Sequence, residues 1–170
     1  MRPTVTFRTL FSFVIIAAAS AAFSSQAYGQ GTRTRTAPPQ NEVRAAAEAV
    51  SIQIKNMTKF LFVLGGVAKG IDDLDKEIKA GRATRELEAK NQEFKDDVIR
   101  SVRAMRTGLV NIERDFIAKP QLRQYLSHVR GISEDSAIAE DLALAGNFNA
   151  SGRQLLLILE RLSDVLVELP

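Results

Sequence analysis

The residues that could do chemistry in this chain are few, and its single histidine is the first to consider. His128 and Met57 are the kind of pair that serves as axial ligands of a b-type haem inside a helical bundle. At 100° per residue, His128 lies about 110° away from the apolar stripe formed by Leu122, Leu126 and Val129. We therefore predict a core methionine and a histidine at the rim or in solvent. We expect no cofactor and assign no residue to cofactor binding.

An acidic cluster, Asp73-x-Asp75-x-Glu77, raises the question of a calcium site. An EF-hand loop needs Gly at its sixth position and Glu at its twelfth, where this chain has Ile78 and Thr84. A di-iron carboxylate bundle needs a Glu three residues before a His, and the only His has none. The cluster is thus predicted to be a solvated helix face, and no metal site is expected.

Nucleophilic and nucleotide-binding motifs are absent from the sequence. The chain has no Cys, no G-x-S-x-G, no phosphate-binding loop and no Gly-rich dinucleotide turn. Two N-glycosylation patterns, at Asn56 and Asn149, fall within or at the start of expected helices and are interpreted as chance matches. We therefore predict a protein that is not an enzyme and has no catalytic residues.

The N-terminal residues 1–29 have the pattern of a secretory signal peptide. Arg2 and Arg8 supply a positive start, and the apolar run from Leu10 to Phe23 is too short to span a bilayer comfortably. Small residues then stand at cleavage spacing, in Ser25-Gln26-Ala27 or Ala27-Tyr28-Gly29. The expected location is periplasmic or secreted, with no membrane span in the mature protein.

The remaining chain is predicted to be a flexible Thr/Arg/Pro linker, residues 30–40, and one helical-bundle domain, residues 41–170. Four of the 23 Lys and Arg residues precede Ala37, whereas all 20 acidic residues follow it. The domain is therefore slightly acidic, and the basic footprint of a nucleic-acid binder is missing.

Charge is nevertheless unevenly distributed along the domain. Residues 98–130 contain seven basic and two acidic residues, and residues 131–170 contain seven acidic residues against Arg153 and Arg161. Neighbouring blocks of opposite sign are expected to face each other in the fold.

A long first helix is predicted from Asn41, as N-cap, to Gly81. Its apolar residues alternate at spacings of four and three, which is typical of a coiled-coil seam: Val43, Ala47, Val50, Ile54, Met57, Leu61, Leu64, Ala68, Ile71, Leu74 and Ile78. Phe60, Val63 and Val67 widen the stripe, so this stretch is expected to be the most deeply buried. Gly65, Gly66 and Gly70 imply that the helix bends there or that another helix approaches closely.

Four further helices complete an all-α prediction. The second runs from Thr84 to just before Pro120, with a seam at Leu87, Phe94, Val98, Val102, Met105, Leu109, Ile112 and Phe116. A short third helix ends at Gly131, the fourth is capped by Ser133 and ends at Gly146, and the fifth is capped by Asn149. The run 155–159 is apolar all round, which predicts a central or interface position, with Leu159 in the core.

The turn at residues 145–149 resembles the inter-helix turn of a tetratricopeptide repeat. No second copy occurs at the 34-residue period of that family, so the resemblance implies a helical hairpin and nothing about function.

The fold class expected is an up-down helical bundle with a long antiparallel coiled-coil hairpin and three shorter helices. The hairpin is longer than the last helix, so its tip, residues 72–97, should project as a charged arm. Fifteen of these twenty-six residues are charged, with expected surface pairs Asp72–Lys76, Asp75–Lys79, Glu86–Lys90 and Asp96–Arg100.

The function expected is that of an exported, non-enzymatic bundle acting through protein–protein contacts, structural or adaptor, in the cell envelope. Its contact is either the arm or the face of the last helix, and it is a possible homo-oligomer. One alternative is a periplasmic holdase-type chaperone. Another is a bundle that binds a small apolar ligand or haem near Phe60–Val67.

Overall fold

A computed structural model describes residues 39–170, and this part of the chain is helical without strands. Its elements are α1 (Pro39–Lys79), α2 (Arg85–Ala118), the 3-10 helix η1 (Pro120–Tyr125), α3 (Leu126–Val129), α4 (Ile132–Leu144) and α5 (Phe148–Glu168). The all-α bundle prediction is confirmed. The predicted signal peptide and most of the predicted linker lie outside the described residues. Within 39–170, no helix is both long enough and apolar enough to cross a membrane.

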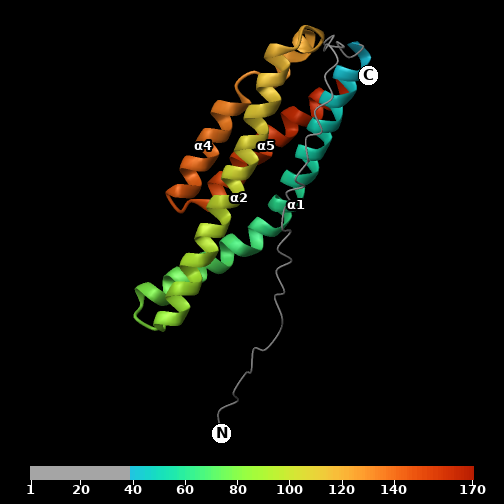
Figure 1. Cartoon of the computed structure of the whole chain (residues 1–170). Helices are drawn as coiled ribbons and strands as arrows, with labels where there is room; N and C mark the ends of the chain where they lie inside the picture. Colours follow the sequence, from blue (N-terminus) through green and yellow to red (C-terminus); the bar gives the residue numbers. More distant parts are fainter. Residues whose placement is uncertain (1–38) are drawn as a thin grey trace, which may run out of the picture. The chain divides into compact units, whose positions relative to one another are not determined.

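Four helices form the bundle, and each packs against two neighbours (Figure 1). The packed pairs are α1 with α2, α2 with α4, α4 with α5, and α5 with α1. This order places α2 and α5 on one diagonal and α1 and α4 on the other. The core between them contains the fully buried side chains Val50, Met57, Val102, Leu109, Phe116, Leu155, Ile158 and Leu162.

Helix α1 begins at Pro39, two residues before the predicted cap Asn41, so the last two residues of the predicted linker are helical. Proline is well suited to a first helical turn, where its missing N–H is not needed. All the residues predicted for the seam up to Ile71 are buried or half-buried. The helix continues through Gly65 and Gly66.

The prediction that the middle of α1 is the most deeply buried stretch is wrong. Phe60 and Val67 pack against the core, but Val63 is exposed and Phe62 is 88% exposed. A Cβ added to Gly65, Gly66 or Gly70 would meet nothing within 4 Å, so no helix within residues 39–170 packs closely against these glycines. Of the two explanations for the glycines, the bend remains, and Figure 1 shows α1 changing direction as it enters its green half.

The observed ends of α2 agree with the sequence prediction, whereas the observed starts of α4 and α5 differ from it. Thr84 caps α2 by accepting a hydrogen bond from the Leu87 amide at 3.3 Å, and α2 ends before Pro120 as predicted. The cap of α5 is Asn147 and not Asn149, because Phe148 is already helical and buried in the core. Helix α4 begins at Ile132, so Ser133 lies inside its first turn and is not its cap.

The tip of the α1–α2 hairpin projects beyond the other helices, as predicted (Figure 1). Asn149 at the start of α5 donates to Asp72 at 3.4 Å, which marks how far α5 reaches along α1. We call residues 73–95 the arm. None of the four predicted surface pairs forms; Lys69–Asp73, Lys76–Asp73, Glu77–Arg82, Asp75–Lys95 and Asp97–Arg100 form instead.

Candidate protein-interaction surface

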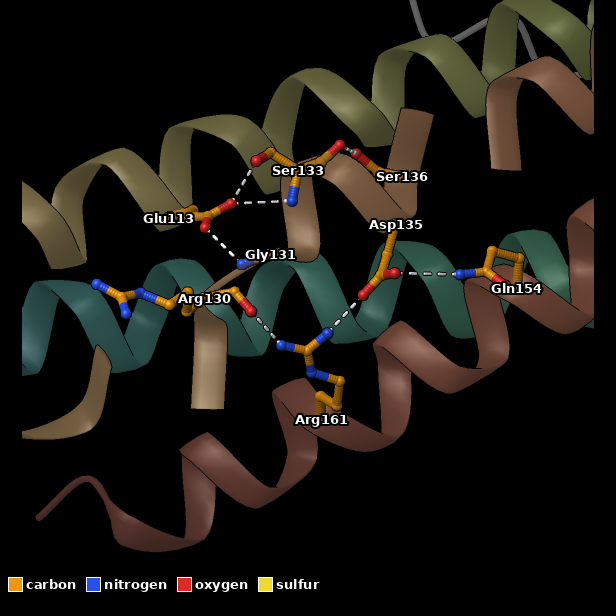
Figure 2. A network of polar contacts seen from close by, with 8 residues as sticks. All are labelled: Glu113, Arg130, Gly131, Ser133, Asp135, Ser136, Gln154 and Arg161. Atoms are coloured by element: carbon orange, nitrogen blue, oxygen red, sulfur yellow. Dashed lines mark hydrogen bonds and ion pairs between the residues drawn. The ribbon is translucent and has the colours of Figure 1, made fainter. Parts of the chain in front are cut away.

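The most highly connected polar group of the body is the buried carboxylate of Glu113 on α2. Its two oxygens accept hydrogen bonds from the Gly131 amide at 2.6 Å and the Ser133 amide at 2.9 Å, and the Ser133 hydroxyl donates to it as well (Figure 2). Gly131 is in the left-handed region, at φ 87°, and offers no side-chain cap of its own. A side chain of α2 therefore satisfies the free amides at the start of α4.

The pKa of Glu113 is held below its ordinary value. Burial alone would raise the pKa, but the hydrogen bonds from Ser133 and Gly131 and the positive charge of Arg161 favour the ionised form and outweigh it. The carboxylate is therefore a structural anion that joins α2 to α4.

A second polar group joins α4 to α5. Arg161 of α5 binds the Asp135 carboxylate and also donates to the backbone carbonyl of Arg130 (Figure 2). Gln154 donates to the other oxygen of Asp135 at 3.4 Å. These contacts fix the α3–α4 connection onto α5, and each oxygen of Asp135 accepts one hydrogen bond.

The opposite charge blocks meet at Glu140, as the sequence predicts for neighbouring segments. Arg103 and Arg106 of α2 each bind one oxygen of this buried carboxylate at 2.7 Å. Hydrogen bonds from Arg106 and Arg103 hold the pKa of Glu140 below its ordinary value. Only these two arginines of the basic block pair with the acidic block; Arg114, Arg123 and Arg130 form no ion pair with any residue in 39–170.

The arm contains a polar contact that the sequence analysis missed. Asn91 is 2% exposed and donates to the Asp75 carboxylate at 2.6 Å, and Lys95 donates to the same oxygen at 2.6 Å. The Asn91 side-chain carbonyl is buried without a partner. Asn91 falls between Leu87 and Phe94 in the four-three rhythm of α2, so its position in the seam was visible from the sequence.

The carboxylates considered for calcium are each neutralised by a cation of the chain. Asp73 binds Lys69 and Lys76, and Glu77 binds Arg82 through both oxygens. Asp75 instead accepts hydrogen bonds from Asn91 and Lys95 of α2. In residues 39–170 no three acidic, histidine or cysteine side chains are gathered in a way that could hold a metal ion.

Met57 and His128 lie far apart. Met57 is fully buried, and His128 is at the rim, where its Nε2 lies 2.9 Å from Glu168 at the end of α5. Both placements agree with the sequence prediction. Gly152 of α5 lies beside Leu64, so Met57, seven residues earlier on the antiparallel α1, is level with about residue 159, and Glu168 lies about 14 Å further along α5. The two side chains cannot bind one haem iron.

Two cavities of the described chain lie away from the Phe60–Val67 region proposed for an apolar ligand. One, of about 570 Å³, is at the end of the bundle and is lined by three glutamines, two prolines, Val43 and Arg44. Another, of about 330 Å³, is a shallow polar depression around Arg103, Arg106 and Glu140. Neither is lined by residues of the Phe60–Val67 stretch, and the second is lined mainly by polar and charged side chains.

Large exposed apolar side chains lie on the body and not on the arm. On α5, Leu156, Leu157 and Val167 are 45%, 54% and 85% exposed. The all-apolar run 155–159 is therefore not central: Leu155 and Ile158 are buried, Leu159 is only half-buried, and the other two point outward. We call the exposed residues Arg153, Leu156, Leu157, Glu160, Asp164 and Val167 the α5 outer face.

Comparison of this chain with models of protein families, with curated proteins and with solved structures finds no match in any of the three. Within residues 39–170, the structure itself defines an all-α bundle with a projecting two-helix arm.

Proposed function

We propose that this chain is an exported, non-enzymatic helical bundle that acts through protein–protein contact, and that the α5 outer face is the contact. The proposal rests on the exposed apolar side chains of α5. Large apolar side chains exposed on one face are typical of interaction sites. Export is inferred from the sequence of residues 1–29 alone.

The arm is the less favoured contact because it exposes no large apolar side chain. Six of its twelve charged side chains are also paired with one another, at Asp73–Lys76, Glu77–Arg82 and Asp75–Lys95. A holdase-type chaperone and a ligand-binding bundle are not supported by a specific contact or cavity, so the adaptor function is the one we carry forward.

Site-specific photo-crosslinking in the native host tests this proposal. A photoreactive amino acid replaces Leu157 in one variant and the exposed arm residue Glu93 in the control. We expect a covalent adduct of higher mass with Leu157 and none with Glu93. An adduct at Glu93 alone would make the arm the contact, and no adduct at either position would overturn the proposal.

A further inference from the structure

The outward faces of α2 and α5 point in opposite directions. Because these helices lie on one diagonal of the bundle, their seams face the same central core from opposite sides. Residues opposite each seam must then point away from each other. Any partner of one face is consequently out of reach of the other face of the same molecule.

The outward face of α2 is basic. Arg100, Arg103, Thr107, Val110, Arg114 and Ile117 are all exposed and follow one another at spacings of three and four, so they share one side of the helix. We call them the α2 outer face. It has three arginines, no acidic residue, and two exposed apolar side chains, Val110 at 38% and Ile117 at 53%.

The α5 outer face has a related arrangement with acidic charge. Arg153, Leu157, Glu160, Asp164 and Val167 also follow the three-four spacing, and Leu156 lies beside them. Arg153 stands at one end, and the two acidic residues occupy the middle, between the exposed apolar side chains.

Part of this charge is not neutralised within the chain, although Arg100 pairs with Asp97 and Arg103 with Glu140. In the described residues, Arg114 of α2 and Glu160 and Asp164 of α5 take part in no ion pair. Within residues 98–170, arginines of the basic block thus pair with the acidic block only at Glu140, and Arg114 lies on the opposite side of the bundle from Glu160 and Asp164.

We propose that the α5 outer face of one molecule binds the α2 outer face of a second copy of this chain. This rests on the proposed function, since it names the partner of the same α5 surface. The two faces are complementary in charge, and both carry apolar side chains that such a contact would remove from water.

The contact is head-to-tail and not two-fold symmetric. A symmetric contact through α2 would place Arg114 and its neighbours against the same arginines, and one through α5 would oppose Glu160 and Asp164 with themselves. Like charges facing each other in an interface are unfavourable. A head-to-tail contact leaves one α2 face and one α5 face free at the ends, so it continues into a ring or an open filament.

Charge-reversal variants test the inference by sedimentation velocity on the mature chain. The first, Thr107→Glu with Arg114→Glu, removes the arginine of the α2 outer face that is unpaired within residues 39–170, adds two acidic side chains, and substitutes neither partner of the Arg103–Glu140 contact. The second, Glu160→Arg with Asp164→Arg, makes the α5 outer face basic. Control variants with the same charge changes are placed on exposed arm residues: Arg85→Glu with Ala89→Glu, and Glu86→Arg with Glu93→Arg.

We expect the wild-type chain to assemble beyond a dimer at low salt, and the assembly to weaken at high salt because the contact is charged. Each face variant alone should be monomeric, with association weakened at least about tenfold. An equimolar mixture of the two should assemble beyond a dimer again, because the two altered faces are complementary to each other and the two unaltered faces remain complementary as well. The arm controls should assemble like the wild type.

A wild-type chain that remains monomeric at low salt and high concentration would overturn the inference, as would face variants that assemble like the controls. The proposed function fails separately. A crosslinked adduct at Leu157 with the mass of two copies of this chain supports both proposals. A Leu157 adduct of another mass, together with a chain that stays monomeric in sedimentation, supports the proposed function and contradicts binding to a second copy.

Discussion

The arm and the body contain consecutive parts of the same two helices, yet they are held together by different interactions. In the body the seam positions of α1 and α2 are apolar and buried, for example Val50, Met57, Val102 and Leu109. In the arm, Leu74, Ile78, Leu87 and Phe94 are only half-buried, and the seam position between the last two is Asn91.

The body also has buried anions that the arm lacks. Glu113 and Glu140 each receive several hydrogen bonds from other elements, and their contacts join α2 to α4. The arm has one contact of this kind, at Asp75. We therefore expect the arm to open locally at a lower free energy than the body unfolds.

The largest expected effect is the loss of a core leucine. Leu162→Ala removes a fully buried side chain of α5 and should lower the free energy of unfolding by about 2–5 kcal/mol. The matched substitution in the arm, Leu87→Ala, should lower it by less than about 1–2 kcal/mol because Leu87 is only half-buried. Chemical denaturation measures both, and equal losses would contradict the difference between the two regions.

The next effect concerns the anion that joins α2 to α4. Glu113→Gln leaves one of the Gly131 and Ser133 amides facing an NH₂ group, and should destabilise the body by about 1–3 kcal/mol. Glu134→Gln, an exposed neighbour, should cost a few tenths of a kcal/mol. Losses of the same size would show that the contact at Glu113 contributes nothing.

The pH dependence of stability sharpens this prediction. The pKa values of Glu113 and Glu140 are lower in the folded chain than their ordinary value of 4.5, so the stability they contribute is fully present above that value. Below pH 4.5 the unfolded chain takes up these protons first, and stability falls until the folded-state pKa values are passed. In Glu113→Gln the loss of stability on acidification should be smaller than in the wild type.

Shortening the arm should have a smaller effect on the whole molecule. Removing residues 73–79 together with 89–95 takes out two turns from each helix and preserves both the seam phase and the Asn149–Asp72 contact. The body should remain folded and lose about 1–2 kcal/mol, because the half-buried apolar side chains of the arm contribute little. Calorimetry measures this, and global unfolding would mean that the body depends on the arm.

The smallest effect is expected at Asn91. Asn91→Leu removes a buried carbonyl that has no partner and places an apolar side chain in the seam, so the arm should gain up to about 1 kcal/mol. The increased protection from amide hydrogen exchange should be confined to amides near Leu87 and Phe94. The same protection throughout α5 would contradict an arm that opens independently.

How far the sequence determines this fold differs between its parts. The long seams were predictable because the four-three rhythm of α1 and α2 is repeated over many turns, and each residue at those positions is buried or half-buried up to Ile71. Thr84 and Pro120 likewise mark the ends of α2 through local backbone chemistry alone. Local signals of this kind do not depend on where the rest of the chain lies.

The predictions that failed depend on contacts between distant residues. Ser133 has a side chain that could cap a helix, but the Glu113 carboxylate of α2 accepts the hydrogen bonds from the first amides of α4 instead. Asp75 pairs with Lys95 across the arm and not with Lys79 one turn away. Glu113 itself continues the seam spacing, four residues after Leu109 and three before Phe116, and an acidic residue there was a visible signal of a buried anion.

The head-to-tail surface was only partly predictable. The opposite charge blocks were evident, but which charges would be neutralised within the chain depends on the diagonal arrangement of α2 and α5. The outward position of Leu156 and Leu157 likewise follows from which side of α5 the core occupies.

The contact between Glu113 and the start of α4 also determines where this chain could be opened by a protease or by a circular permutation. The link at residues 80–84 joins α1, which ends near Gly81, to α2, which is capped by Thr84. A break there would interrupt the chain only at the tip of the arm. The link at residues 119–131 looks equivalent as a short connection. It instead leads directly into a helix whose first amides depend on an anion in α2. A break there would free the start of α4 from its only cap, so of the two connections the arm tip is the one that tolerates new chain ends.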